Sequence, residues 1–181
     1  INHIVFAGMG GSGAIGDIFA SILSKTDIHV SVVKGYTLPK TVSKKTLIVT
    51  TSISGNTIET LTILDEANQK GCKTIAFTSG GKMEEYCKKN KVEYKKIKRI
   101  HSPRASFTIF LYSMLKVLKP ILPISMDEIN DSLVQLEVME KIINSKNLTE
   151  SNPALNLANW IQGVPIIYYP SGLQSVAIRF K

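Results

Sequence analysis

The stretch "TLIVTTSISGNTIE", residues 46–59, joins a short apolar run to a turn of small polar residues. Its first half is rich in Ile, Val and Thr, as expected of a strand that is buried on both faces. Helical periodicity then begins at Ile58 and continues to Gln69, with Gly71 as the stop. A buried strand, a polar turn and a helix in direct succession predict an α/β protein.

The same succession recurs along the chain. It predicts a doubly wound α/β fold, in which a five-stranded parallel sheet lies between helices. The predicted strands are residues 3–7, 28–33, 46–51, 73–78 and 92–97. The predicted helices are residues 14–24, 58–69, 83–90, 105–118, 126–143 and 153–162, with a capping box of Ser125 and Glu128 before the fifth.

Three parts are predicted by composition. Residues 1–122 hold the sheet, residues 123–152 form a helix and a linker, and residues 153–181 begin a second, similar and incomplete domain. The last prediction depends on "VPIIYYPSG", residues 164–172, where another apolar strand would run into a Ser-Gly turn.

Composition excludes several classes of protein. With 181 residues and 44% hydrophobic content, the chain can bury a core. It has no apolar run near the ~18 residues of a membrane span and no signal peptide, so no membrane partner is expected. Two cysteines without histidines at ligand spacing fit a reducing cytoplasm and predict no metal site.

The net charge of +8 raises the question of nucleic acid. Much of this charge lies in "KKNKVEYKKIKR", residues 88–99, which has one aromatic residue and no nucleic-acid-binding module around it. We interpret this basic tract as a solvated helix end and an edge strand, and expect no nucleic-acid partner. A basic rim can still attract an anionic small molecule.

The turn "GMGGSGAIGD", residues 8–17, matches G-x-G-x-x-G through Gly8, Gly10 and Gly13. The dinucleotide reading fails because Lys34, and no carboxylate, follows the next strand. No Gly-Lys-Ser/Thr follows either, so a P-loop is excluded. Two interpretations of the glycines remain. They could let the backbone approach a ligand beside free N–H groups at Gly13 or Ala14. Alternatively, they could form a tight turn in which helix and strand pack closely.

In the polar turn of residues 51–59, Asn56 and Glu59 fit a helix cap with its reciprocal partner. Ser52, Ser54 and Thr57 are not needed for that cap. Hydroxyls beside the N–H groups of a helix start form an uncharged cradle for phosphate, so we predict phosphate binding here. Capping alone is the competing interpretation.

A third candidate is "HSPRAS", residues 101–106, between the last strand and a helix. Arg104 is expected in the first helical turn, where its charge opposes the helix dipole. Such an arginine commonly faces an anion or a carboxylate, and the alternative is a solvated side chain.

Together these segments resemble the sugar isomerase (SIS) domain, and within it the archaeal-type bifunctional phosphoglucose/phosphomannose isomerase family. The segments that carry the resemblance are "GMGGSGAIGD", "SISGNTIET", "SPRAS" and "NPALNLANWIQGVPIIYYPSGLQSVAIRFK", and they extend over essentially the whole chain. The resemblance implies two SIS domains in tandem, a homodimer, and interconversion of glucose 6-phosphate or mannose 6-phosphate with fructose 6-phosphate. Glycolysis and gluconeogenesis would be the setting.

The resemblance also implies roles for particular residues. Ser52, Ser54 and Thr57 would bind the phosphate, Gly11 and Ser12 would lie at the sugar, and Arg104 would stabilise the enediolate, as a fixed cation beside developing negative charge can. No metal or organic cofactor is implied.

The chain departs from the family pattern at its end. The family's base is a glutamate of an Asn-Glu segment shortly after the stretch that ends here as "AIRFK", and a histidine still further on comes from the neighbouring subunit. Neither position occurs before Lys181, so we expect weak sugar-phosphate binding without turnover. A sugar-phosphate sensor of a transcription regulator, and an aminotransferase or other SIS enzyme, are the alternatives.

Overall fold

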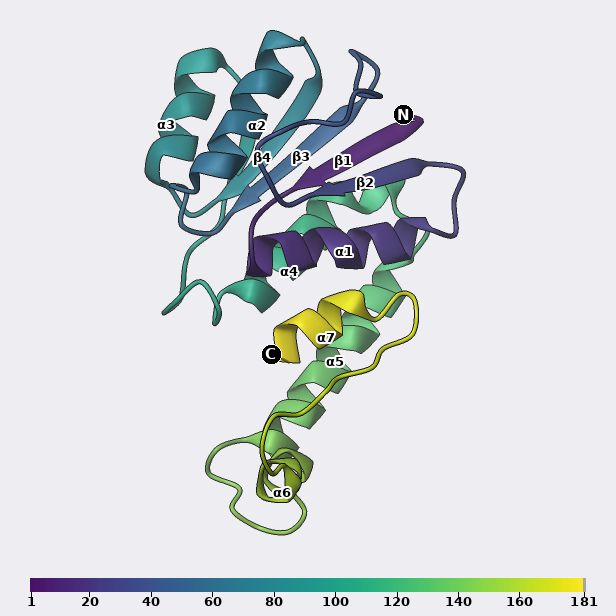
Figure 1. The fold of residues 1–181 in the computed structure, drawn as a ribbon, viewed down its shortest axis with the longest axis vertical. Helices are drawn as coiled ribbons and strands as arrows, with labels where there is room; N and C mark the ends of the chain where they lie inside the picture. The colour runs from purple at the N-terminus through teal and green to yellow at the C-terminus, as the bar shows by residue number, and fades with distance from the viewer. Residues whose placement is uncertain (181) are drawn as a thin grey trace. The chain divides into compact units, whose positions relative to one another are not determined.

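Five parallel strands form the centre of the fold, which a computed structural model describes for residues 1–180 (Figure 1). The strand order is β2-β1-β3-β4-β5, and each neighbouring pair is parallel. The strands are β1 His3–Ala7, β2 His29–Val33, β3 Leu47–Ser52, β4 Lys73–Thr78 and β5 Glu93–Lys96. The predicted α/β class and the five predicted strands of the sheet are confirmed.

Alternate residues of β1 serve two helical layers. Val5 lies in one buried cluster with Ile63 of helix α2 (Ile58–Gln69). Phe6 points to the other face, where its ring stacks on Phe19 of helix α1 (Gly11–Leu23) with centroids 5.1 Å apart. Figure 1 shows α2 and α3 on one face of the sheet and α1 and α4 on the other. This alternation explains why the strands are apolar throughout.

The remaining helices that belong with the sheet are α3 Gly81–Asn90, α4 Phe107–Leu118 with the 3₁₀ turn Lys119–Ile121, and α7 Gln174–Phe180. Helix α4 starts two residues later than predicted, because Ser106 is fully buried and its hydroxyl donates to the Ser102 carbonyl at 2.9 Å. That bond belongs to a turn at residues 101–106.

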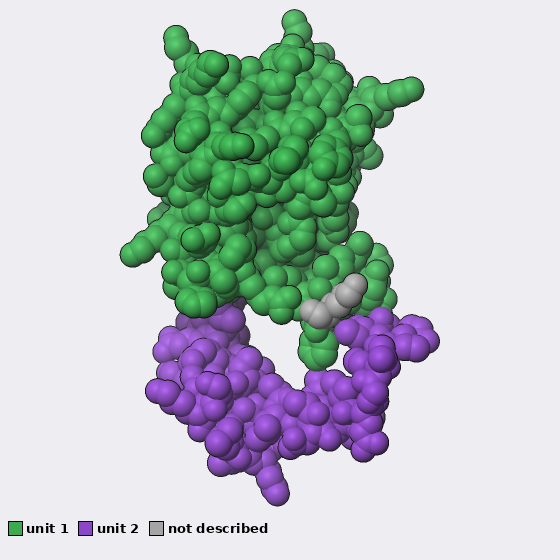
Figure 2. Space-filling model, turned by 60° about the vertical axis from the view of Figure 1, so that its left-hand side comes forward, with its two compact units in different colours: residues 1–123, 169–181 green, residues 124–168 purple. Residues whose placement is uncertain are grey.

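The chain divides into two compact units, residues 1–123 with 169–181, and residues 124–168 (Figure 2). The second unit contains α5 Met126–Ile143 and α6 Pro153–Trp160. The predicted capping box of α5 is confirmed: Ser125 Oγ accepts from the Glu128 amide at 3.0 Å, and the Ser125 amide donates to the Glu128 carboxylate at 2.6 Å. The three predicted domain ranges stay a prediction.

One predicted strand is wrong. Residues 164–170 form neither strand nor helix. An apolar segment becomes a strand only through hydrogen bonds to a neighbour, and none of β1 to β5 pairs with this one. No helix within residues 1–180 is long and apolar enough to cross a membrane.

The basic tract of residues 88–99 lies where we expected it. Lys88 and Lys89 form the exposed last turn of α3, and β5 is an edge strand of the sheet. Its lysines Lys95 and Lys96 are exposed, while Ile97 is buried just after the strand.

Candidate functional site

The candidate site lies at the carboxyl edge of the sheet, between β1 and β3. The chain leaves β1 to form β2 on one side and leaves β3 to form β4 on the other, so the two connections diverge. Such a switch point leaves a crevice that open α/β sheets use for ligands. The glycine turn after β1 and the polar turn after β3 both lie at this edge.

Three hydroxyl groups come together in the turn between β3 and α2. Thr57 Oγ1 lies 3.0 Å from Ser52 Oγ and 3.5 Å from Ser54 Oγ. Thr57 is the N-cap of α2, and its side chain makes no capping bond to that helix. Ser52 is 1% exposed and its hydroxyl accepts from the Gly55 amide, so Ser52 is the buried member of the cluster. Ser54 and Thr57 are the half-buried members.

The predicted cap of Asn56 with Glu59 is wrong. Helix α2 begins one residue later than that cap requires, with Thr57 as its N-cap. The Asn56 side-chain oxygen instead accepts from the Lys82 amide at 3.1 Å, in the first turn of α3. Asn56 therefore joins two neighbouring turns of the sheet edge, and the hydroxyls of its own turn stay free of that task.

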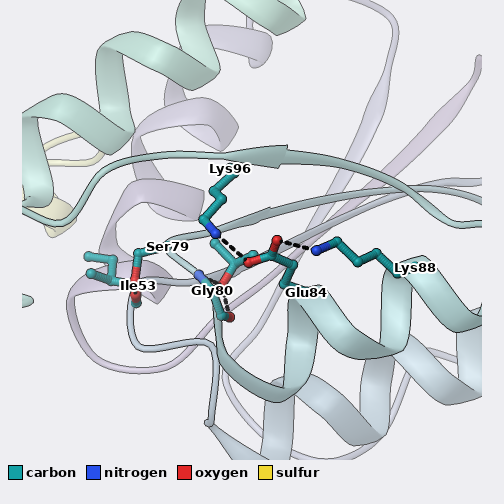
Figure 3. A network of polar contacts seen from close by, with 7 residues as sticks. Ile53, Ser79, Gly80, Glu84, Lys88 and Lys96 are labelled. Atoms are coloured by element: carbon teal, nitrogen blue, oxygen red, sulfur yellow. Dashed lines mark hydrogen bonds and ion pairs between the residues drawn. The ribbon is translucent and has the colours of Figure 1, made fainter.

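Two further bonds tie the hydroxyl turn to the start of α3. Ser79 Oγ donates to the Ile53 carbonyl at 2.5 Å, and the Met83 amide donates to the Gly55 carbonyl at 2.9 Å. Figure 3 shows Ser79 beside Ile53 in this region. The turn between β4 and α3 thus holds the backbone of the hydroxyl turn, and this fixes the positions of its side chains.

The start of α3 is itself fixed by Glu84, whose carboxylate lies between two lysines (Figure 3). It pairs with Lys88 on the same helix and with Lys96 on β5, each at 2.8 Å. Hydrogen bonds from Lys88 and then Lys96 lower the pKa of Glu84. The carboxylate stays ionised and holds the edge strand to the helix.

The glycine turn mainly serves close packing. Helix α1 begins at Gly11, and the amides of Ser12 and Gly13 both donate to the Met9 carbonyl, at 3.0 and 3.3 Å. The Ala14 amide donates to the Gly10 carbonyl at 3.0 Å, so the prediction of free N–H groups at Gly13 or Ala14 is wrong. A Cβ on Gly13 would meet the Gly8 carbonyl oxygen at 2.6 Å. The tight-turn interpretation explains Gly8 and Gly13, whereas Gly11 and Ser12 line a cavity.

Arg104 lies in the turn before α4 and not in a first helical turn, so that prediction is wrong in detail. The turn is closed by Ser102, whose carbonyl accepts from both the amide and the hydroxyl of Ser106. Pro103 and Arg104 project from it and are exposed.

A cavity of about 280 Å³ brings most of the predicted residues together. It is lined by Met9, Gly11, Ser12, Ile53, Ser54, Thr57, Pro103, Arg104 and Arg179. Ser52 does not line it. The lining has two guanidinium groups, three hydroxyl side chains and no carboxylate, so it suits an anion.

Sequence reasoning missed Arg179. It lies on α7, and its guanidinium reaches the turn that carries Arg104. The only signal in the sequence is a single arginine in the largely apolar run "SVAIRF", residues 175–180. Which cavity that arginine faces depends on the packing of α7 against α1, which local sequence does not specify.

The sequence matches the SIS domain family over residues 1–116. The chain belongs to the SIS domain family. Within residues 1–180 of this SIS protein, no group of three or more His, Cys, Asp or Glu side chains could hold a metal ion.

Comparisons with individual proteins agree with this assignment. The chain is 34% identical, over all of its length, to a bifunctional phosphoglucose/phosphomannose isomerase of Caldicellulosiruptor bescii, of which it covers 55%. A protein of the same name from Aquifex aeolicus is also 34% identical, over 98% of this chain and 53% of its own. The crystal structure of tagatose-6-phosphate ketose/aldose isomerase from Escherichia coli superposes with a TM-score of 0.53 and 25% identity, covering 66% of this chain and 37% of that one. The SIS chain thus spans about half the length of the curated relatives it matches.

Proposed function

We propose that this chain supplies the sugar-phosphate site of an isomerase that interconverts glucose 6-phosphate or mannose 6-phosphate with fructose 6-phosphate. The observation that carries the proposal is that Ser54, Thr57 and Arg104 line the same cavity at the sheet's switch point. The names of the 34% identical relatives support the choice of substrate.

In the proposed mechanism, the hydroxyl cluster binds the phosphate. Ser54 and Thr57 would donate to its oxygens, and Ser52 would hold Thr57 in place from below. Each hydrogen bond to a charged group contributes about 1.5–3 kcal/mol. The positive end of the α2 dipole adds to this attraction.

Arg104 would act on the sugar end. Removal of a proton from the carbon beside the carbonyl leaves an enediolate, whose negative charge a fixed guanidinium stabilises. Gly11 and Ser12 line the same cavity and would lie against the sugar. Because the reaction proceeds by proton transfers between neighbouring atoms of the sugar and involves no net redox change, the proposal includes no cofactor.

A general base is not part of the described cavity, since no carboxylate or histidine lines it. We therefore expect the 181-residue chain to bind fructose 6-phosphate without converting it. The homodimer, the cytoplasmic location and a role in glycolysis and gluconeogenesis stay predictions.

Titration calorimetry of the 181-residue chain tests the proposal. Fructose 6-phosphate should bind, and unphosphorylated fructose should not. The double variant Ser54→Ala/Thr57→Val should weaken binding about tenfold or more. Thr62→Val is a matched control, because Thr62 is exposed one turn further along α2 and its hydroxyl bonds only within that helix.

Two results would count against the proposal. Equal affinity for fructose and fructose 6-phosphate would mean that the hydroxyl cluster is no phosphate site. Rapid formation of glucose 6-phosphate by this chain in a coupled assay would mean that it contains a base that this mechanism lacks.

A further inference from the structure

Arg179 is held at the cavity by three contacts within the sheet-containing unit. Helix α7 is anchored on α1 by Ser175, which is 4% exposed and donates to the Ala14 carbonyl at 2.7 Å. One end of the Arg179 guanidinium donates from Nη2 to the Arg104 carbonyl at 3.3 Å. Its plane lies over the Phe107 ring, with the central carbon 4.6 Å from the ring centroid. These contacts fix the group in one place.

The guanidinium of Arg179 lies at the sugar side of the proposed site. Its Nη1 lies close enough to Gly11 that a Cβ added there would be only 3.2 Å from it. Gly11 and Arg104 are the residues proposed to contact the sugar, whereas the phosphate cluster belongs to the turn between β3 and α2. Arg179 is therefore the neighbour of Arg104 and not a member of the phosphate cluster.

Two positively charged side chains, Arg104 and Arg179, line this cavity. Within residues 1–180, neither Arg104 nor Arg179 forms an ion pair. Burial and the charge of Arg104 both lower the pKa of Arg179, burial more strongly. Two like charges facing one cavity repel each other, and an anion between them removes that cost. Two positive charges at one cavity therefore favour a bound anion between them.

We propose that Arg179 is a second substrate-binding cation, which acts with Arg104 on the charge that develops at the carbonyl end of the sugar. The inference rests on the proposed function, and adds to it that Arg179 binds the substrate and that its target is the charge at the carbonyl end of the sugar. It follows that Arg179 favours the enediolate over the ground-state sugar.

The test compares two ligands of the 181-residue chain. 5-Phosphoarabinonate carries a carboxylate where the enediolate is charged, and fructose 6-phosphate has no charge there. Wild type should bind 5-phosphoarabinonate the more tightly. Arg179→Ala should weaken 5-phosphoarabinonate binding about tenfold, the effect of one lost charged hydrogen bond, and fructose 6-phosphate binding about threefold or less.

Further variants separate the charge from the packing. Arg179→Lys keeps the charge and should keep part of the preference for 5-phosphoarabinonate. Arg179→Gln keeps a polar side chain without the charge and should lose the preference as fully as alanine does. Lys45→Ala removes one exposed positive charge at the opposite, amino-terminal edge of the sheet and should change neither affinity.

The outcomes are distinguishable. Equal weakening of both ligands in Arg179→Ala, or a preserved preference in Arg179→Gln, would show that Arg179 only shapes the turn, and would overturn the inference while leaving the proposed function intact. Unchanged affinities in Arg179→Ala would overturn it too. If wild type binds neither ligand, the proposed function itself fails, and the inference fails with it. Thermal unfolding followed by circular dichroism confirms that each variant is folded.

Discussion

The glycine turn after β1 and the hydroxyl turn after β3 occupy equivalent positions at the same edge of the sheet, yet they do different work. In the glycine turn, the amides of Ser12 and Gly13 bond within the turn, and the missing side chains let helix and strand approach. In the hydroxyl turn, the Ile53 carbonyl and the Asn56 side chain bond to the neighbouring turn, and the Ser54 and Thr57 side chains line the cavity. A motif rich in glycine is therefore weaker evidence for a ligand than a turn whose hydroxyl side chains line a cavity.

The largest effect should come from Gly55→Ala. Gly55 has φ +72°, and a Cβ there would lie 1.8 Å from the Gly80 carbonyl oxygen, which is backbone and cannot move aside. We expect a loss of roughly 4 kcal/mol or more in the free energy of unfolding, measured by urea denaturation.

Gly10→Ala is the matched variant in the other turn. Gly10 also has positive φ, +52°, but nothing lies within 4 Å of its added Cβ. Backbone strain alone should cost about 1–3 kcal/mol. If Gly10→Ala were as damaging as Gly55→Ala, the difference between the two turns would not come from their packing.

Gly13→Ala tests whether the glycine turn serves packing. The added Cβ would meet the Gly8 carbonyl oxygen at 2.6 Å, although Gly13 has ordinary helical φ. We expect a loss of about 2 kcal/mol in unfolding free energy. Gly35→Ala, where the Cβ would meet nothing, should be neutral or stabilising by up to about 1 kcal/mol. Equal stability of the two variants would contradict the packing role.

Thr60→Val tests whether the Thr60 hydroxyl, close to the hydroxyl turn, has a structural role or a role in ligand binding. Thr60 is 1% exposed in the first turn of α2, and its hydroxyl has no hydrogen-bond partner in the structure. Replacing an unpaired buried hydroxyl should raise the unfolding free energy by about 1 kcal/mol, and fructose 6-phosphate affinity should not change. Exposed Thr62→Val should shift stability by about 0.5 kcal/mol or less. A loss of affinity in Thr60→Val would extend the site to this residue.

The smallest effect is expected from His3→Gln, at the amino end of β1 and so at the opposite edge of the sheet from the two turns. Burial, and then the nearby His29, lower the pKa of His3. The unfolded chain therefore binds more protons than the folded one once the pH falls below about 6.5, the ordinary value for histidine. Stability should be full above that pH and decrease as the pH falls towards the lowered value. Urea midpoints at pH 7.5 and 5.5 should differ less in His3→Gln, and an unchanged difference would place the pH dependence elsewhere.

Local pattern predicted the strands of the sheet, the ends of helix α2 to within one residue and the capping box of α5, because each depends on neighbours in sequence. It also selected Ser54, Thr57 and Arg104, which share one cavity. Contacts between distant segments were beyond it. Asn56 bonds to a residue 26 positions away, and Arg179 reaches Arg104 across 75. The apolar segment at residues 164–170 failed as a strand for the same reason, since pairing depends on a partner and not on composition.

The short lysine-rich strand β5 has a further consequence. As an edge strand it leaves a row of backbone donors and acceptors without a neighbouring strand, which is the usual template for association of sheets between molecules. Four residues, two of them lysines, give an incoming strand little length to pair with and a repulsive charge to overcome. The basic tract that first suggested nucleic acid would instead protect the protein from aggregation, and neutral substitutions at Lys95 and Lys96 should lower its solubility.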